Sequence, residues 1–180
     1  MTVYFRMRSD TLPACESWGR KARVFQDPIR YSQMGGNFDL TADAPVDAAR
    51  SGGAARLVAR ALEQGVSITK ITISSDGYGS QPVFNENLEC VGMTYSRCNT
   101  IHDELCRMVT KEHIPMEEAL QTITSNVANR MGLSGRKGVI TPGADADLVV
   151  WDDRLRIVQV YARGKLAYNG GKPLLKGGFE

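Results

Sequence analysis

The sequence predicts an α/β fold in which parallel strands alternate with helices, followed by a small module built from strands. The first observation is that apolar, strand-like runs at residues 37–41 and 71–74 flank a stretch with helical periodicity. The second is that the runs are far enough apart for a crossover of a dozen or more residues, which parallel strands require. The third is a change, after Gly138, to short β-rich runs separated by turns.

The N-terminal part supplies the first helix and the first strand. Residues 1–24 show no clean period and are left without an element. Residues 24–32 are expected to form a helix despite an internal proline, and Gly35 would end it. Residues 37–41 then predict a buried strand.

The crossover helix and the second strand follow. Ala54 to Gln64 places apolar residues at helical spacing, and Gly65 after them is a common helix terminator. The β-branched run Ile71-Thr72-Ile73, at the end of residues 66–74, is typical of a strand. Strand, helix and strand therefore form one βαβ unit.

Two more helices and a β module are predicted after this unit. Apolar residues at helical spacing indicate a helix over residues 92–111. A second helix is expected from Pro115, a favoured first-turn residue, to Gly132. Beyond Gly138 the strand-like runs lie at residues 147–152, 156–161 and 165–168, with turns such as Asn169-Gly170-Gly171 between or after them.

Composition narrows the classes of function. The 180 residues are 42% hydrophobic and 23% charged, which suits one soluble domain or slightly more. A net charge of +2 with both signs interspersed gives no argument for a nucleic-acid or membrane partner. No window approaches the ~20 apolar residues of a membrane span. The four cysteines form no Cys-x-x-Cys pair, so reduced thiols and a cytoplasmic location are expected.

The segment Ile-Ser-Ser-Asp-Gly-Tyr-Gly-Ser-Gln-Pro, from Ile73 to Pro82, contains the strongest candidate for chemistry. Asp76 follows a predicted parallel strand, where catalytic loops begin in such folds, and its carboxylate can bind a metal or act as a general base. Asp-Gly is also a common turn pair, so a plain turn role stays open. Gly77 and Gly79 allow backbone to approach a ligand and Ser80 offers a hydroxyl, but each also suits an ordinary turn.

Other chemically capable residues favour structural roles. His102 lies beside the apolar face of a predicted helix, and His113 lies at a helix C-terminus, where positive charge is stabilised. A zinc site needs three or four ligands, and the sequence has no His-x-His pair, so it shows no self-sufficient zinc site. Asp145, Asp147 and Asp152 lack the spacing of a calcium loop and are expected at turns and strand edges.

Two stretches of the sequence together resemble the amidohydrolase superfamily. Gly138 to Asp152, followed by Val160 to Gly164, is similar to the C-terminal β module of that superfamily, whose members carry a metal-dependent hydrolase site on a (β/α)8 barrel. The segment from Ile73 to Pro82, with residues 35–41 upstream and residues 159–166 downstream, further resembles the isoaspartyl (β-aspartyl) dipeptidases.

This resemblance runs from about Phe25 to the C-terminus and implies an architecture. The chain would be the C-terminal portion of the barrel, about its last two βα units, plus a small β-sandwich module. Residues 1–24 remain an unassigned start. Residues 25–137 would form the partial barrel with strands seven and eight, and residues 138–180 would form the C-terminal part of the β module.

The resemblance also implies roles for individual residues. Asp76 would be the strand-eight carboxylate at a centre of two divalent metals, usually zinc, that hold a bridging hydroxide. It would take the proton of that hydroxide during attack on a β-aspartyl dipeptide and return it to the leaving amine. Ser80 matches the family's serine that contacts the α-carboxylate of the substrate. Arg20 corresponds, by its distance from Phe25, to an arginine with the same task.

The family's remaining ligands do not have counterparts in this sequence. They are a His-x-His pair on strand one, a carboxylated lysine on strand four, and histidines on strands five and six, the last of which would fall near Ser17. A complete barrel typically needs ~250 residues, and two strands alone would leave parallel edges open. We therefore expect association with further copies or with a complementary N-terminal polypeptide.

Several interpretations stay open at this point. The chain is the C-terminal part of a longer enzyme, a half that assembles with another polypeptide, or a non-catalytic remnant that only packs against partners. An amidohydrolase that acts on another amide substrate is a further alternative.

Overall fold

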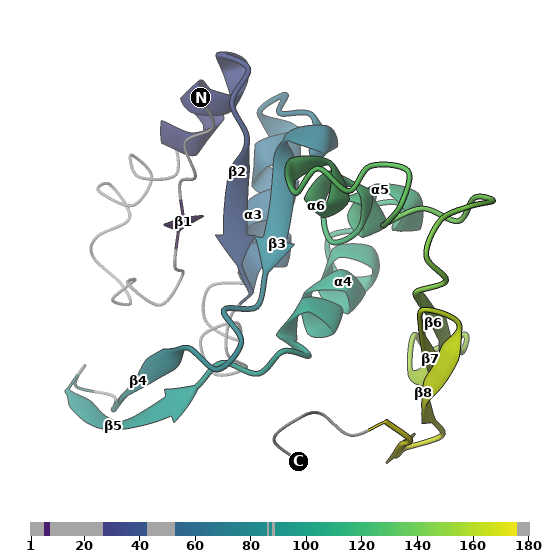
Figure 1. Ribbon diagram of the computed structural model, residues 1–180. Helices are drawn as coiled ribbons and strands as arrows, with labels where there is room; N and C mark the ends of the chain where they lie inside the picture. Colours follow the sequence, from purple (N-terminus) through teal and green to yellow (C-terminus); the bar gives the residue numbers. More distant parts are fainter. Residues whose placement is uncertain (1–5, 8–26, 43–52, 86, 88, 176–180) are drawn as a thin grey trace. The chain divides into compact units, whose positions relative to one another are not determined.

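The computed structural model describes residues 6–7, 27–42, 53–85, 87 and 89–175. Contacts divide the chain into two compact units, Met1–Val127 and Ala128–Glu180. Among the described residues, the first unit holds a parallel sheet, a β-hairpin and most of the helices, and the second holds a four-stranded antiparallel sheet. Figure 1 shows the order of these elements along the chain.

The parallel sheet of the first unit has the order β1-β2-β3. Its strands are β1 (Arg6–Met7), β2 (Phe38–Thr41) and β3 (Ile71–Ser74), and both neighbouring pairs run parallel. Helix α3 (Gly53–Glu63) crosses over between β2 and β3 and contacts β2. The predicted βαβ unit is therefore confirmed.

The residues before β2 also follow the sequence pattern. Residues 27–33 are helical, which confirms the described part of the helix expected at residues 24–32. The chain leaves this helix through Gly35, whose φ of +92° is in the left-handed region that glycine adopts without a steric cost. Residues 8–24 lie outside the described residues.

Strands β2 and β3 bury one apolar face against the helical layer. Side chains alternate between the two faces of a strand, so the residues at positions 38, 40, 71 and 73 share one face. All four have exposed fractions of 3% or less, and they are Phe38, Leu40, Ile71 and Ile73. Helix α3 contributes a buried stripe of small residues, among them Ala54, Val58 and Ala61. This layer forms the core of the first unit.

The edge of β3 that faces away from β2 is covered by side-chain and loop contacts. The Ile73 amide donates to the Thr122 carbonyl at 3.0 Å. The Asn126 side-chain amide donates at 2.9 Å to the carbonyls of both Ile68 and Ile71. Because Asn126 is only 3% exposed, these two bonds satisfy its buried side-chain amide and tie the segment that follows Thr122 to the start of β3.

A β-hairpin replaces the start of the helix predicted at residues 92–111, so that prediction is wrong at its N-terminal end. Strands β4 (Ser80–Phe84) and β5 (Cys90–Tyr95) pair antiparallel, and helix α4 spans only Thr100–Thr110. Residues 91, 93 and 95 are apolar and alternate with smaller or polar residues, which is the period of a strand.

The turn of the hairpin is held by one side chain. The Asn85 side-chain oxygen accepts from the amides of Asn87 and Glu89, at 2.9 Å each. This Asx-type bonding is what asparagine does in tight turns. Asn85 is therefore the sequence signal for this turn, and the helical spacing of the apolar residues after Tyr95 concealed the hairpin.

The helix expected from Pro115 to Gly132 is two short helices. These are α5 (Met116–Gln121) and α6 (Ser125–Arg130). Between them, the Thr122 and Thr124 hydroxyls donate to the carbonyls of Ala119 and Leu120, at 2.7 and 2.6 Å. Such side-chain bonds to the preceding turn compete with regular helix bonding and often bend helices.

The second unit contains the predicted β module. Its strands, in the order β6-β7-β8-β9, are all antiparallel, and they are β6 (Leu148–Trp151), β7 (Ile157–Ala162), β8 (Lys165–Asn169) and β9 (Lys172–Pro173). The turn at Gly170 and Gly171 has positive φ at both residues. Within the described part of the chain this module is one sheet, and the expected second sheet of a sandwich is not part of it.

Candidate functional site

Asp76 lies two residues beyond the end of β3, in the short loop that leads to β4. The carboxylate is partly buried, and the residue has a φ of +51°. Tyr78 in the same loop has a φ of +62°. Positive φ is uncommon for residues other than glycine, and such strained positions cluster at functional sites. The loop is therefore a candidate site on its backbone geometry.

Hydrogen bonds fasten this loop to the strand end opposite it. The Gly79 amide donates to the Asp76 carbonyl at 2.7 Å and closes a tight turn. The Tyr78 amide donates to the Ser96 carbonyl, and the Ser96 amide donates to the Gly79 carbonyl, both at 2.9 Å. Because Ser96 is buried, the loop is anchored just beyond the end of β5.

The two loop glycines are required by close packing. A Cβ atom at Gly77 would lie 2.6 Å from the Cys98 sulfur, and one at Gly79 would lie 2.8 Å from the Asp76 carboxyl carbon. Both distances are too short for a real side chain. Gly79 thus leaves room for the carboxyl group of Asp76 against the turn, and Gly77 leaves room for the Cys98 sulfur.

Of the other two predicted site residues, Ser80 lies within the described part of the chain and Arg20 does not. Ser80 is exposed and begins β4, where it pairs with Tyr95 across the hairpin. Arg20 lies outside the described residues, as does Ser17. Ser80 thus lies at the end of the loop that carries Asp76, four residues farther along the sequence.

A polar cluster beside the candidate site was missed by the sequence reasoning. Asp39 on β2 accepts hydrogen bonds from the hydroxyls of Thr72, at 2.6 Å, and Ser74, at 2.5 Å, on β3. Thr41 pairs with Ser74 in the parallel register, and its buried hydroxyl has no partner among the described residues. The signal was the strict alternation of Phe38 and Leu40 with polar neighbours, which marks a second, polar face of the same strands.

This polar face ends at the same edge of the sheet as the candidate loop. Thr41 and Ser74 are the last residues of their strands, and Asp76 lies two residues beyond Ser74. Hydroxyl and carboxylate groups therefore converge at the carboxyl ends of β2 and β3. In parallel α/β sheets this is the edge at which ligands bind.

The described residues do not form a metal centre by themselves. No group of three or more histidine, cysteine, aspartate or glutamate side chains suited to a cation is present among them. His102 lies one turn from Cys106 on α4, with its Nε2 3.7 Å from the sulfur. Burial, together with the nearby Asp103, raises the pKa of the Cys106 thiol. The donor set fits neither one nor two metals without further ligands.

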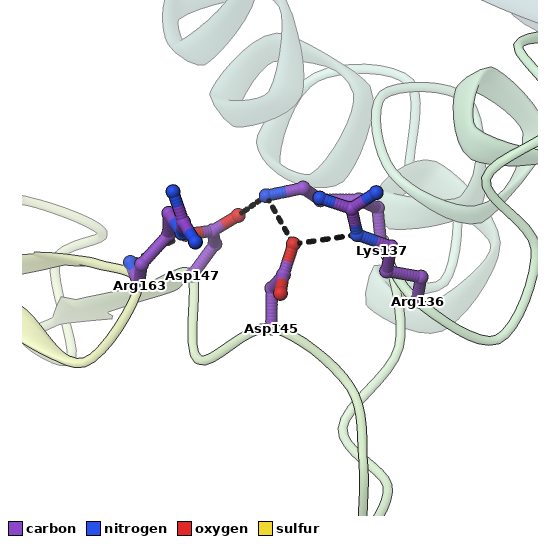
Figure 2. Close-up of polar contacts among 5 residues, drawn as sticks. All are labelled: Arg136, Lys137, Asp145, Asp147 and Arg163. Atoms are coloured by element: carbon purple, nitrogen blue, oxygen red, sulfur yellow. Dashed lines mark hydrogen bonds and ion pairs between the residues drawn. The ribbon is translucent and has the colours of Figure 1, made fainter.

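The aspartates of the second unit form ion pairs and turns. Lys137 contacts both Asp145 and Asp147, and Arg136 bonds to Asp145 at 3.1 Å (Figure 2). The hydrogen bond from Lys137 holds the pKa of each of the two carboxyls below its usual range. Asp152 accepts from two backbone amides that follow it, at 2.9 Å each. The expected turn and edge roles are confirmed.

The comparisons with known proteins identify the family of the chain. Residues 35–170 match the amidohydrolase family. The match covers more than half of the chain, so the chain belongs to the amidohydrolase family. Members of this family are hydrolases and are typically metal-dependent. No described helix is long and apolar enough to cross a bilayer.

Sequence relatives include enzymes with different substrates. N-acetylglucosamine-6-phosphate deacetylases of Bos taurus and Homo sapiens are 29% and 30% identical over 126 residues, which is 64% of this chain and 31% of each relative. Adenine deaminase 2 of Rhizobium meliloti is 37% identical over 71 residues, 38% of this chain and 12% of that protein. The chain therefore spans about a third of the length of the deacetylases.

Solved structures give the most extensive likeness. A β-aspartyl dipeptidase from Fervidobacterium islandicum, in complex with β-Asp-Leu, is similar with a TM-score of 0.71 and 27% identity over 88% of this chain and 40% of that chain. N-acetylglucosamine-6-phosphate deacetylase from Thermotoga maritima has a TM-score of 0.54 and 14% identity over 74% of this chain and 39% of that one, a likeness of fold alone. The resemblance to the β-aspartyl dipeptidases is thus confirmed.

Proposed function

We propose that this chain carries the strand-eight part of a β-aspartyl dipeptidase active site, with Asp76 as the carboxylate at the reacting bond. The observation that carries the proposal is the position of Asp76 in a fastened loop directly after β3 of the parallel sheet. Support comes from the 27% identity and the TM-score of 0.71 to a β-aspartyl dipeptidase.

The proposed chemistry is hydrolysis of the amide between a β-carboxyl group and an amino acid. Water attacks the amide carbonyl, and the Asp76 carboxylate accepts one proton from that water. The C–N bond then breaks, and the same carboxyl returns its proton to the departing amine. A positioned carboxylate can both accept and return a proton in this way, because each transfer is a short hydrogen-bonded step.

Two residues are proposed to hold the substrate. Ser80 follows the loop by one residue and offers an exposed hydroxyl to the substrate's α-carboxylate. Arg20 is proposed for the same group as a charged, bidentate partner. The zinc ions expected from the resemblance would need ligands in addition to Asp76, because the described residues hold no suitable cluster. These ligands would come from the rest of a longer enzyme or from a complementary polypeptide, because the sequence has no counterparts for them.

A second candidate function is hydrolysis of an acetamide on an amino-sugar phosphate. The observation in its favour is the 30% identity to the human deacetylase over 126 residues. The larger TM-score and greater coverage of the dipeptidase favour the peptide substrate. The remaining alternative is a chain that takes part in assembly without catalysis.

The test is an assay of β-Asp-Leu hydrolysis with added zinc. The chain is used alone and mixed with the separately produced segment of the Fervidobacterium islandicum dipeptidase that it does not match. Wild type is compared with Asp76→Asn, because asparagine tolerates the positive φ at this position while it cannot accept the proton. We expect hydrolysis in the mixture and a loss of at least about 100-fold in the variant, the range for removal of a general base.

The outcomes separate the three candidates. Hydrolysis of N-acetylglucosamine-6-phosphate in place of β-Asp-Leu would support the deacetylase. Equal turnover by wild type and Asp76→Asn would remove the proposed role of the carboxylate. A stable complex without any hydrolysis would support a role in assembly only. Asp103→Asn, a half-buried aspartate on α4, is the matched control and should retain activity.

A further inference from the structure

We propose that Tyr78 and Tyr95 form an aromatic platform that binds the side chain of the amino acid on the leaving-amine side of the substrate. The platform would give the site a preference for apolar and aromatic residues over glycine at that position. This inference rests on the proposed function, because the platform is placed beside the reacting bond only if Asp76 acts there.

The two rings are stacked and open to solvent. Their centroids lie 6.1 Å apart with an angle of 16° between the planes. Tyr78 is 78% exposed and Tyr95 is 59% exposed. Offset stacking at this distance is favourable for aromatic rings, and it holds both in one orientation with large apolar faces uncovered.

The platform is fixed relative to Asp76. Tyr78 follows Asp76 by two residues, and its amide is bonded to Ser96, the residue after Tyr95. The Ser96 amide is in turn bonded to Gly79. Both tyrosines therefore belong to the same hydrogen-bonded frame as the candidate carboxylate, and a ligand on the rings lies next to the loop that carries it.

The backbone strain at Tyr78 indicates that its ring is exposed for binding and is not placed there by packing. A bulky residue with a φ of +62° costs free energy in a loop where asparagine or glycine would fit without strain. The ring does not recover that cost by burial, because most of its surface is exposed. Residues held in sparsely populated backbone conformations cluster at ligand-binding sites, which supports a binding role for Tyr78.

The surface next to the platform extends its apolar character. Met93 and Val91, which precede Tyr95 in alternate positions of β5, are 64% and 60% exposed. Alternate residues of a strand share one face, so these side chains continue the face that carries Tyr95. We place the side chain of the leaving amino acid on this apolar face, and the α-carboxylate of the substrate at Ser80 and Arg20.

The experiment measures side-chain preference by two independent readouts. The first is the ratio of kcat/KM for β-Asp-Phe to that for β-Asp-Gly, in the hydrolysing mixture defined above. The second is ligand-observed NMR binding of the same two dipeptides to the chain in the Asp76→Asn background, where the proposed chemistry is blocked. Tyr78→Asn removes the ring and relieves the positive φ, and Tyr95→Thr removes the second ring with a residue that suits a strand.

We expect wild type to prefer β-Asp-Phe and each ring-deleting variant to lose about fivefold of that preference, as expected for one aromatic contact. Tyr78→Phe keeps the stack and should stay within about twofold of wild type. Met34→Ala, which removes another highly exposed apolar side chain, is the control and should change nothing.

Three results would overturn the inference. One is an unchanged preference in Tyr78→Asn and Tyr95→Thr while β-Asp-Gly is still hydrolysed, which leaves the proposed function intact. Another is absence of any preference in wild type by both readouts. The third is a change of oligomeric mass in the tyrosine variants without a change in preference, which would identify the rings as a protein interface. If hydrolysis fails but ring-dependent binding of β-Asp-Phe persists, the proposed function fails, and the two rings remain a binding surface without a role in hydrolysis.

Discussion

The parallel sheet of the first unit and the antiparallel sheet of the second are built from similar residues and differ in how deeply they are buried. Ile71 and Ile73 on β3 are 0% and 3% exposed, whereas Val149 and Val150 on β6 are 46% and 43% exposed. Helix α3 and the segment around α5 and α6 cover β2 and β3. β-Branched composition therefore predicts that a segment is a strand, and the elements that cover it decide its burial.

The ionisable groups of the two units differ in the same way. Glu104 on α4 is completely buried, accepts from the Ala55 amide at 2.7 Å at the start of α3, and contacts Arg107. Burial raises the pKa of this carboxyl despite both partners. Asp145 and Asp147 in the second unit are near solvent, and their ion pairs lower their pKa. Burial thus sets the direction of the pKa shift at Glu104, and pairing with Lys137 sets it at Asp145 and Asp147.

The comparison is tested most strongly by equivalent truncations in the two sheets. Leu40→Ala removes a side chain with 0% exposure, and we expect it to lower the free energy of unfolding by about 3 kcal/mol, through lost burial and a cavity. Val150→Ala removes a side chain that is 43% exposed and should cost no more than about 1 kcal/mol.

Urea unfolding gives the free energy of unfolding of both variants, with a separate spectroscopic probe for each unit. Far-UV circular dichroism at 222 nm follows the helices, most of which lie in the first unit. In a Trp18→Phe background, Trp151 on β6 is the sole tryptophan, and its fluorescence follows unfolding of the second unit. Equal costs for the two truncations would mean that β6 is covered in solution, as association with further copies or with another polypeptide would cause.

The strands were predictable because their apolar runs are short and bounded by clear turn residues. β2, β3 and β6 fall within the runs that the sequence indicates, and β7 and β8 each extend one residue beyond theirs. The hairpin of β4 and β5 was not predicted, because its period-2 pattern runs directly into the helical spacing of α4. Where two periods adjoin without glycine or proline, the boundary is not readable from periodicity.

The candidate site was predictable only where one residue type stands out. Asp76 is an isolated carboxylate that follows a predicted parallel strand, and this position identified it as a candidate. Asp39 was not identified, because its partners Thr72 and Ser74 are 33 and 35 residues away in the sequence. The stack of Tyr78 on Tyr95 likewise depends on the hairpin register that brings residue 95 back to the loop. Contacts set by pairing register require the fold.

Glu104 gives the second test, through the dependence of stability on pH. A carboxyl whose pKa is raised on folding contributes stability that is present below its unfolded pKa, about 4.3, and is lost as pH rises through the folded pKa. We therefore expect the stability of wild type to fall with a slope of up to about 1.4 kcal/mol per pH unit from this group alone. Glu104→Gln, which does not titrate, should lack that slope.

The measurement is the urea midpoint by circular dichroism, taken from about pH 4.3 upward, for wild type and Glu104→Gln. Glu117→Gln, an exposed glutamate in the first turn of α5, is the control and should keep the wild-type profile. A Glu104→Gln profile parallel to wild type would show that Arg107 and the Ala55 amide, and not burial, determine the charge state of this carboxyl.

The ion pairs around Lys137 are expected to have the smallest effect on stability, and their pH dependence is opposite in sign to that of Glu104. Asp145 and Asp147 have lowered pKa values, so their contribution is present above the unfolded value, about 3.9, and is lost as pH falls through the folded values. Lys137→Met should lower the urea midpoint reported by Trp151 less than any change above, because solvent screens these charges. In about 1 M salt, where the Debye length is about 3 Å, the difference from wild type should shrink further. A large effect that salt does not reduce would show that the cluster is shielded from water, and the contrast between a buried carboxyl in one unit and exposed pairs in the other would not hold.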